Sequence, residues 1–489
     1  MAAALIRNRP VSLNDVQHFA SAEPDLPGPW CAEQPVVGRL PEMRITMATA
    51  PLGGLRTRSS AVARLAYLST ILGSAWAARS IFNPFQELVR TDLGLGDVEM
   101  SLVQGAAMSV PSILLSIVIG RLIDTRKRVM LLALLNAVTM LGVIGTAFSQ
   151  GFVSLAGYRA LSGLGMLEEV VVFSLVADLF PPEQRGRANI MIVVGDYAGS
   201  SLGFALAGWL LRFVQVIPFH GNSVGWRGVQ CLFGMIGLLA TLPLLTMREP
   251  DRRECSDVAG LAFRDSLKRL WRERTVLGPL LAGQVAMAAV GNIVWIWALP
   301  SLYRTFGFSP AELGNIAAGI MAAAALIGAF GAGLLVDHLA AMKGTSLAVA
   351  AFSCALAIPA SLFPFSHSLP VGAALLFLLV LANTATALSC NTFGVIAIPN
   401  DLRGLWFGIS GVAALVVGYA IAPTLVACLS DLLGGERAMA TALAIALIGA
   451  NAIALAAYVE AYRVAISRPA DLLAPDDAAL LSASQYGQR

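Results

Sequence analysis

Long apolar stretches alternate with short polar connections from residue 62 to residue 464. Each stretch is long enough for a helix that crosses a bilayer, which requires about 20 mostly apolar residues. We place twelve such helices near 62–85, 99–119, 129–148, 152–176, 188–211, 228–247, 276–303, 310–336, 345–363, 370–396, 404–428 and 438–462. The pattern therefore predicts an all-α membrane protein with 12 transmembrane helices.

A longer polar segment separates the sixth and seventh stretches, so the helices fall into two groups of six. We expect an N-terminal six-helix bundle over 61–247, a central cytoplasmic loop over 248–275 and a C-terminal six-helix bundle over 276–464. The flanking segments 1–60 and 465–489 lack hydrophobic periodicity, and we predict that they are disordered cytoplasmic tails.

The central loop contains one helical pattern, because Phe263, Leu267, Leu270 and Trp271 recur at helical spacing. Basic residues interleave with them: Arg264, Lys268, Arg269, Arg272 and Arg274. A basic amphipathic helix of this kind suits the anionic inner leaflet of the bilayer. A plain tether between the two halves is the alternative role.

Composition excludes a soluble protein. Of the 489 residues, 57% are hydrophobic and 13% are charged, whereas soluble domains are about 25% charged. Most of the basic residues fall on one side of the predicted membrane, and the positive-inside rule then places both termini in the cytoplasm. The net charge of +3 reflects this bias in the loops and gives no indication of a nucleic-acid partner.

Signatures of an ATP-driven pump or a metalloenzyme are absent from the sequence. It contains no Gly-x4-Gly-Lys-Ser/Thr phosphate loop, and its four histidines (His18, His220, His338 and His367) are dispersed. The six cysteines show no metal-ligand or disulfide spacing. We therefore expect no metal, no cofactor and no enzymatic activity, and any transport would be driven by a gradient.

One short motif occurs in both halves, at the end of the second helix of each. The first copy contains Gly120, Leu122 and Asp124, and the second contains Gly333, Leu335 and Asp337. The first copy continues to Arg128, and it resembles the loop signature Gly-x-Leu-x-Asp-Arg-x-Gly-Arg-Arg of the major facilitator superfamily. Thr125 and Lys127 depart from that signature. The resemblance implies two pseudo-symmetric bundles, and a motif that closes the cytoplasmic side in one state of a transport cycle.

Further elements extend the resemblance over most of 62–464. They include Arg159-x3-Gly163-x-Gly165 in the fourth helix, Asp178 after it, and Arg248-Glu249-Pro250 after the sixth. These details are most similar to the spinster-type and organic-anion-type branches. In the fifth helix, Gly195, Gly199, Gly203 and Gly208 form a small-residue face. By the resemblance, we expect that face to meet the eighth helix.

Ionisable residues inside a membrane are functional candidates by default, because burying a charge is costly. Arg79 and Arg159 lie within the first and fourth helices, and guanidinium groups bind carboxylate or phosphate through two hydrogen bonds. We predict that both bind an anionic substrate, with interhelical pairing or a gating role as the alternatives.

Carboxylates also lie inside the predicted helices, at Glu168, Glu169 and Asp196. Carboxylates that lose water or lie close together hold a proton more readily near neutral pH. We predict a proton-coupling role for these three residues. Pairing of one of them with Arg159 is the alternative.

Several polar and aromatic residues are weaker candidates for the substrate site, and a position at the membrane interface is the alternative for the aromatic ones. They are Asn83 in the first helix, Trp295 and Tyr303 in the seventh, Asn383 and Asn391 in the tenth, and Tyr419 in the eleventh. Asn83-Pro84 and Pro300 are expected to bend helices in matching positions of the two halves. Such interruptions are typical of a transporter binding site.

The sequence as a whole predicts a secondary active transporter that moves a small organic anion by alternating access, with proton coupling. An exporter or flippase of amphiphiles such as lysophospholipids or drugs is the second hypothesis, and a transporter-like receptor without turnover is the third. We expect a monomer in a bacterial inner membrane. Met1, Met43 and Met47 are candidate starts.

Overall fold

The structure is a computed structural model that describes residues 53–214, 225–250, 252, 263–338, 345–398 and 400–467. The described residues from Leu55 onward form one compact unit. The regular elements of the described ranges are all helical. The predicted tails lie outside these ranges, except that residues 53–60 begin the first helix and 465–467 end the last one.

The first half of the chain contributes six predicted spans, several of which are built from more than one helix. Its elements are α1 (Gly53–Ser80), η1 (Asn83–Phe85), α2 (Gln86–Leu93), α3 (Asp97–Gln104), α4 (Ala106–Thr125), α5 (Arg128–Thr146), α6 (Phe152–Gly163), η2 (Leu164–Leu167), α7 (Glu168–Leu179), α8 (Pro182–Val214), α9 (Gly225–Thr241) and η3 (Leu242–Thr246).

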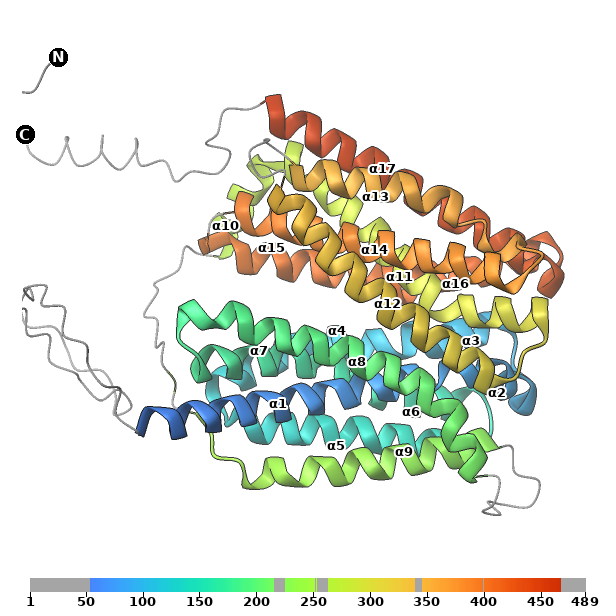
Figure 1. Ribbon diagram of the computed structural model, residues 1–489, viewed down its shortest axis with the longest axis horizontal. Helices are drawn as coiled ribbons and strands as arrows, with labels where there is room; N and C mark the ends of the chain where they lie inside the picture. The colour runs from blue at the N-terminus through green and yellow to red at the C-terminus, as the bar shows by residue number, and fades with distance from the viewer. Residues whose placement is uncertain are drawn as a thin grey trace, which may run out of the picture. The chain divides into compact units, whose positions relative to one another are not determined.

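The second half begins with the amphipathic helix of the central loop and continues with the other six spans. Its elements are α10 (Phe263–Arg272), α11 (Arg274–Phe306), α12 (Pro310–His338), α13 (Thr345–Ala360), η4 (Phe363–Phe365), α14 (Leu369–Ala397), α15 (Asn400–Ala413), the π-helical η5 (Ala414–Ile421), α16 (Ala422–Leu433), η6 (Gly435–Ala438) and α17 (Met439–Ser467). Figure 1 shows the first half, in blue to green, and the second half, in yellow to red, as two adjoining layers of long helices.

Eleven helices of the described ranges are long and apolar enough to cross a membrane. The first predicted span, which corresponds to α1, is not among them. Its apolar pattern is interrupted by Arg64 and Arg79 and by several small polar residues, and most of its residues from Leu68 to Ser80 are buried. The second part of α1 is therefore packed mainly against protein.

The glycine face of α8 packs against α1, so the prediction that it meets the eighth helix is wrong for most of its length. A Cβ at Gly195, Gly199 or Gly203 would overlap Ser69, Gly73 or Ser80 of α1. Gly208 alone of the four meets the eighth span, where Ala311 of α12 leaves no room for a Cβ. The small residues thus fix the α1–α8 contact inside one half.

Two spans are interrupted where the halves meet. Gly105 breaks the helical path between α3 and α4 with φ −97° and ψ −83°, and a Cβ there would overlap the carbonyl oxygen of Tyr419 in η5. A π-helix is rare and often marks a functional site. The break at Gly105 in the first half and the π-helix η5 in the second half allow the backbones of the two halves to touch at this point.

We expect Gly199→Ala to destabilise the protein, because the added Cβ would meet backbone atoms of Gly73 that cannot move aside cheaply. Overpacking of this kind typically costs about 1–3 kcal/mol. Thermal unfolding in detergent would show a lower Tm for Gly199→Ala. The control is Gly157→Ala in α6, where nothing lies within 4 Å of an added Cβ. Equal Tm values for the two variants would contradict the tight α1–α8 packing.

Candidate functional site

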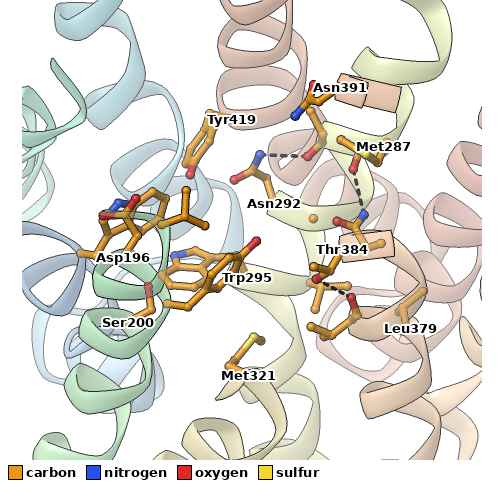
Figure 2. Close-up of a pocket in the computed structure, with 18 of the residues that line it drawn as sticks. Asp196, Ser200, Met287, Asn292, Trp295, Met321, Leu379, Thr384, Asn391 and Tyr419 are labelled. Carbon is orange, nitrogen blue, oxygen red and sulfur yellow. Dashed lines mark hydrogen bonds between the residues drawn. The ribbon is translucent and has the colours of Figure 1, made fainter. Parts of the chain in front are cut away.

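A cavity of about 470 Å³ lies between the two halves (Figure 2). The first half lines it with Trp76, Glu169, Val193, Asp196, Tyr197 and Ser200. The second half lines it with Met287, Ala288, Gly291, Asn292, Val294, Trp295, Met321, Leu379, Val380, Asn383, Thr384, Asn391 and Tyr419. All charged lining residues come from the first half, and the polar residues of the second half are neutral.

Arg79 lies behind the first-half wall of the cavity. Its guanidinium carbon is 3.7 Å from the ring centroid of Trp76, and the residue is only 4% exposed. Its Nε has no hydrogen-bond partner, and within the described ranges its guanidinium forms no ion pair. Arg79 lies within electrostatic range of Glu168, Glu169 and Asp196. It is therefore a buried cation near three carboxylates, two of which line the cavity, and it forms an ion pair with none of them.

Arg159 is the second buried arginine, and it does not line the cavity. Its guanidinium lies 4.3 Å from the ring centroid of Phe82, and its Nη2 is 2.9 Å from the sulfur of Met108. No carboxylate among the described residues pairs with it, so the structure does not show the predicted alternative of an acidic partner for Arg159. Its anion-binding role remains a prediction.

The three predicted proton carriers are in different environments. Glu169 and Asp196 line the cavity, and Oδ1 of Asp196 is buried without a hydrogen bond. Glu168 points elsewhere: it is fully buried and accepts hydrogen bonds from Asn136 (3.0 Å) and Thr139 (3.1 Å) of α5. This geometry favours Glu169 and Asp196 for exchange with the cavity and gives Glu168 a role in joining α5 to α7.

Four of the weaker substrate candidates line the cavity, namely Trp295, Asn383, Asn391 and Tyr419. Tyr303 lies farther along α11, partly buried against the core of the second half. Asn83 is also outside the lining, but its side-chain amide donates a 3.0 Å hydrogen bond to the carbonyl oxygen of Trp295. It therefore joins the first half to the cavity wall of the second.

Aromatic side chains pack beside that hydrogen bond. The rings of Trp76 and Trp295 meet edge to face with centroids 6.2 Å apart, and Phe204 of α8 lies 5.2 Å from Trp295 on another side. Phe204 also contacts Gly314 of α12, where its carbonyl oxygen would overlap an added Cβ. Trp295 thus serves as both a cavity wall and a contact between the halves.

Charged residues join the halves at the end of the bundle that carries α2, α3 and η6, which we predict to face outside. Arg304 of α11 binds Glu87 of α2 at 2.8 Å and Asp97 of α3 at 2.5 Å. Arg90 of α2 binds Glu436 of η6 at 2.6 Å. The side chains of Glu87 and Asp97 are almost completely buried. These ion pairs join the two halves on the predicted outer side, and we name them the outer clamp.

The opposite end carries the loop motif. Arg128 at the start of α5 bonds to Glu249 (3.2 Å), to Ser174 of α7 (3.0 Å) and to the carboxylate of Asp178. The motif residue Arg128 thus meets two acidic residues from other family-like elements of the sequence, Asp178 and Glu249. All these contacts lie within the first half and its connection to the central loop.

The other motif residues make few contacts. The carbonyl oxygen of Asp124 accepts a hydrogen bond from Arg252, but its carboxylate is exposed. A Cβ at Gly120 would meet nothing within 4 Å, so no neighbouring helix approaches closely there in this structure. Leu122 packs partly against the core of the first half.

In the second copy of the motif, Leu335 is 40% exposed. The surroundings of Gly333 and the side chain of Asp337 lie outside the described part of the structure. The gating role of both copies therefore remains a prediction.

Several residues of the cavity were not predicted from the sequence. Asn292 is a single amide in an apolar run, and the same signal that pointed to Asn383 would have found it. Tyr197 and Ser200 flank Asp196 on α8. Trp76 precedes Arg79 by three residues, which places the two side chains on one face of α1. Their orientation toward the cavity depends on helix rotation, which apolar stretches do not specify.

Two bundles of six predicted spans with a cavity between them are typical of a membrane transporter and not of an enzyme. The sequence pattern of the Major Facilitator Superfamily matches residues 68–423, which is most of the chain. The chain belongs to this superfamily.

Solved structures agree with this assignment at the level of the fold. A bacterial homologue of the human lysosomal transporter Spinster, in an inward-facing and unoccupied conformation, aligns with a TM-score of 0.70 and 20% identity over 86% of this chain and 99% of that one. A D-xylose–proton symporter aligns with a TM-score of 0.62 and 17% identity over 81% and 97%.

Curated relatives match over shorter segments. The sugar transporter ERD6-like 15 of Arabidopsis thaliana is 29% identical over 38% of this chain and 37% of its own length. The trichosetin biosynthesis cluster MFS transporter of Gibberella fujikuroi is 28% identical over 30% of each chain. The chain thus spans about a third of the length of the curated relatives that it matches.

We expect Arg304→Gln to open the outer clamp, because it leaves Glu87 and Asp97 buried without their strongest cationic partner. Removal of one member of a buried ion pair typically costs about 3–5 kcal/mol. A cysteine at Ser101, a buried position of α3 that hydrogen-bonds Thr424 across the halves, would report the opening in a cysteine-free background. Its reaction with a membrane-impermeant thiol reagent should accelerate.

The matched control is Arg437→Gln in η6, which removes an exposed arginine beside the same clamp. It should leave the labelling rate unchanged. Equal rates in Arg304→Gln and the parent protein would show that the clamp does not hold the halves together.

Proposed function

We propose that the protein is a proton-coupled secondary transporter of a small organic anion, which binds in the cavity between the halves. The observation that carries the proposal is Arg79, a buried guanidinium without an ion-pair partner in the described ranges, stacked on a tryptophan that lines the cavity. The substrate would supply the missing anion.

The physical argument begins with the solvation of the guanidinium. A charge withdrawn from water needs a compensating charge or hydrogen bonds, and leaving one partner of a buried pair alone is strongly unfavourable. Among the described residues, the ring of Trp76 stacks on the Arg79 guanidinium, and no carboxylate forms an ion pair with it. A cation–π contact contributes about 0.5–2 kcal/mol, which is less than a bidentate carboxylate provides. Arg79 is therefore prepared to accept an anion.

Glu169 and Asp196 supply the coupling. When both carboxylates are ionised, they interact with the positive charge of Arg79 and compete with an anionic substrate for it. When they are protonated, the charge of Arg79 is available to the substrate. Proton and anion binding then favour each other, and by thermodynamic linkage each raises the affinity for the other by the same factor.

The proposal also assigns the cycle and its surroundings. The outer clamp closes one side while substrate enters from the other, and rocking of the two halves exposes the cavity alternately. We place both termini in the cytoplasm of a bacterial cell, with one chain as the transport unit. The distribution of Lys and Arg supports that orientation.

Arg79→Gln should impair anion uptake into proteoliposomes. Loss of a hydrogen bond to a charged group costs about 1.5–3 kcal/mol, so kcat/KM should fall roughly 10- to 150-fold for a carboxylate substrate found by screening a panel. Arg212→Gln, which alters an exposed arginine at the end of α8, should behave as the parent protein. Uptake by Arg79→Gln at the parental KM would exclude Arg79 as the anion site.

Glu169→Gln and Asp196→Asn should separate substrate movement from the proton gradient. Each variant permanently mimics a protonated carboxyl, so exchange of labelled for unlabelled substrate should continue. Stimulation of net uptake by an inward proton gradient should be lost in at least one of them. If both variants keep full gradient stimulation, the coupling group lies elsewhere, and Glu168 becomes the next candidate.

A second function is favoured by the largely apolar cavity wall, which includes Met287, Met321, Leu379 and Val380. This surface suits the acyl chain or ring system of an amphiphile, such as a lysophospholipid or a drug. Movement of a fluorescent lysophospholipid in the same proteoliposomes, unaffected by any carboxylate, would support export of amphiphiles. Arg79 would then act in gating.

A further inference from the structure

The second-half wall of the cavity presents two side-chain amides whose orientation is fixed. Nδ2 of Asn292 donates to the carbonyl oxygen of Ala288 at 2.8 Å, and Nδ2 of Asn383 donates to that of Met287 at 3.1 Å. A carbonyl oxygen can only accept, so in each amide the nitrogen must face the backbone. The side-chain oxygen of each therefore points away from that bond.

Both oxygens remain free to accept a hydrogen bond. Neither Asn292 Oδ1 nor Asn383 Oδ1 accepts one from a described residue, and neither is sealed from the cavity. Asn383 Oδ1 lies beside Gly291, where an added Cβ would stand 3.3 Å away. Figure 2 shows the oxygen of Asn292 turned away from its hydrogen bond, toward the side of Tyr419. Two neutral acceptors thus face one space, from α11 and α14.

The chemistry of this wall restricts which part of a substrate it can bind. At these two amides a carboxylate would meet oxygen lone pairs and be repelled, so the anionic end must bind elsewhere, and the proposed function places it toward the first half. An ammonium group would be drawn instead to Glu169 and Asp196 on the opposite wall, because these carry the only charges of the described lining. Neutral acceptors without a nearby charge are best satisfied by hydroxyl groups.

We infer that Asn292 and Asn383 form a hydroxyl-binding subsite, and that the substrate is an organic acid with hydroxyl groups at the end remote from its carboxylate. The hydroxyl end of this assignment stands on the geometry of the two amides, while the carboxylate end rests on the proposed function. An acid that lacks the hydroxyl groups would leave both amide oxygens without partners. The site should therefore select acids with hydroxyl groups, because other acids leave the two amide oxygens without hydrogen bonds.

Calorimetric binding to the purified protein in nanodiscs tests this inference with probes that share a six-carbon skeleton. Gluconate carries five hydroxyl groups beside its carboxylate, hexanoate carries none, and 6-aminohexanoate carries an ammonium group. Gluconate should bind about tenfold or more tightly than hexanoate, since each hydrogen bond contributes a fewfold gain. Asn292→Leu and Asn383→Leu should each reduce this preference several-fold.

Hexanoate serves as the internal control, because its Kd should stay within about twofold in both leucine variants if they fold correctly. Arg212→Gln, which alters an exposed arginine outside the cavity lining, should leave the preference for gluconate unchanged. Equal binding of gluconate and hexanoate by the parent protein would overturn the subsite. Preferential binding of 6-aminohexanoate, or an equal loss of both acids in the variants, would overturn it as well.

Sorbitol, the neutral six-carbon polyol, separates failure of the subsite from failure of the proposed function. If sorbitol binds as well as gluconate and Asn292→Leu weakens both, the hydroxyl subsite holds and the anionic substrate is wrong. If the two acids bind equally and Arg79→Gln weakens both, the anion site holds and the hydroxyl subsite is wrong.

Discussion

The stacking of Arg79 on Trp76 places a positive charge immediately behind the wall of the cavity, with the guanidinium carbon 3.7 Å from the ring centroid. A low-dielectric surrounding strengthens the interaction of that charge with anything nearby. In the proposed function, the two cavity carboxylates, Glu169 and Asp196, and a bound anion all interact with this charge. Proton coupling and substrate binding would then both depend on the electrostatics of the first half.

The second half contributes most of the cavity wall, its neutral hydrogen-bonding groups, and contacts that join it to the first half. Trp295 has three functions there, since it lines the cavity, packs on Trp76 and accepts the hydrogen bond of Asn83 through its carbonyl oxygen. A movement of Trp295 in the cavity would consequently also alter the contact between the halves. The outer clamp lies beyond this contact, where Arg304 completes the closure with buried carboxylates.

The sequence predicted the helices well, because a span needs a long apolar run wherever lipid surrounds it. The predicted spans 129–148 and 152–176 correspond to Arg128–Thr146 and Phe152–Leu179. Breaks within spans, such as the one at Gly105, were missed, since they arise from contact with Tyr419 of the other half. The partner of Gly195, Gly199 and Gly203 in α8 was wrong for the same reason: small residues show that a close partner exists but do not identify it.

The site was predictable only in part. Polar residues inside the predicted spans indicated a site that includes Glu169, Asp196, Asn383 and Tyr419, and all four line the cavity. It could not distinguish these from Glu168, which is one residue away and bonded to α5. Arg304 appeared in the sequence as one more basic residue at the outer side, because its partners Glu87 and Asp97 are more than 200 positions away.

The sharing of Arg79 between the carboxylates and the substrate is tested most directly by the number of protons taken up when the anion binds. A pH-sensitive dye in weakly buffered solution would report this number for the purified protein near neutral pH, with a carboxylate already shown to be transported. The account predicts net proton uptake on binding, which is reduced or lost when Glu169 and Asp196 are replaced by Gln and Asn. Anion binding without proton uptake, or with proton release, would contradict it.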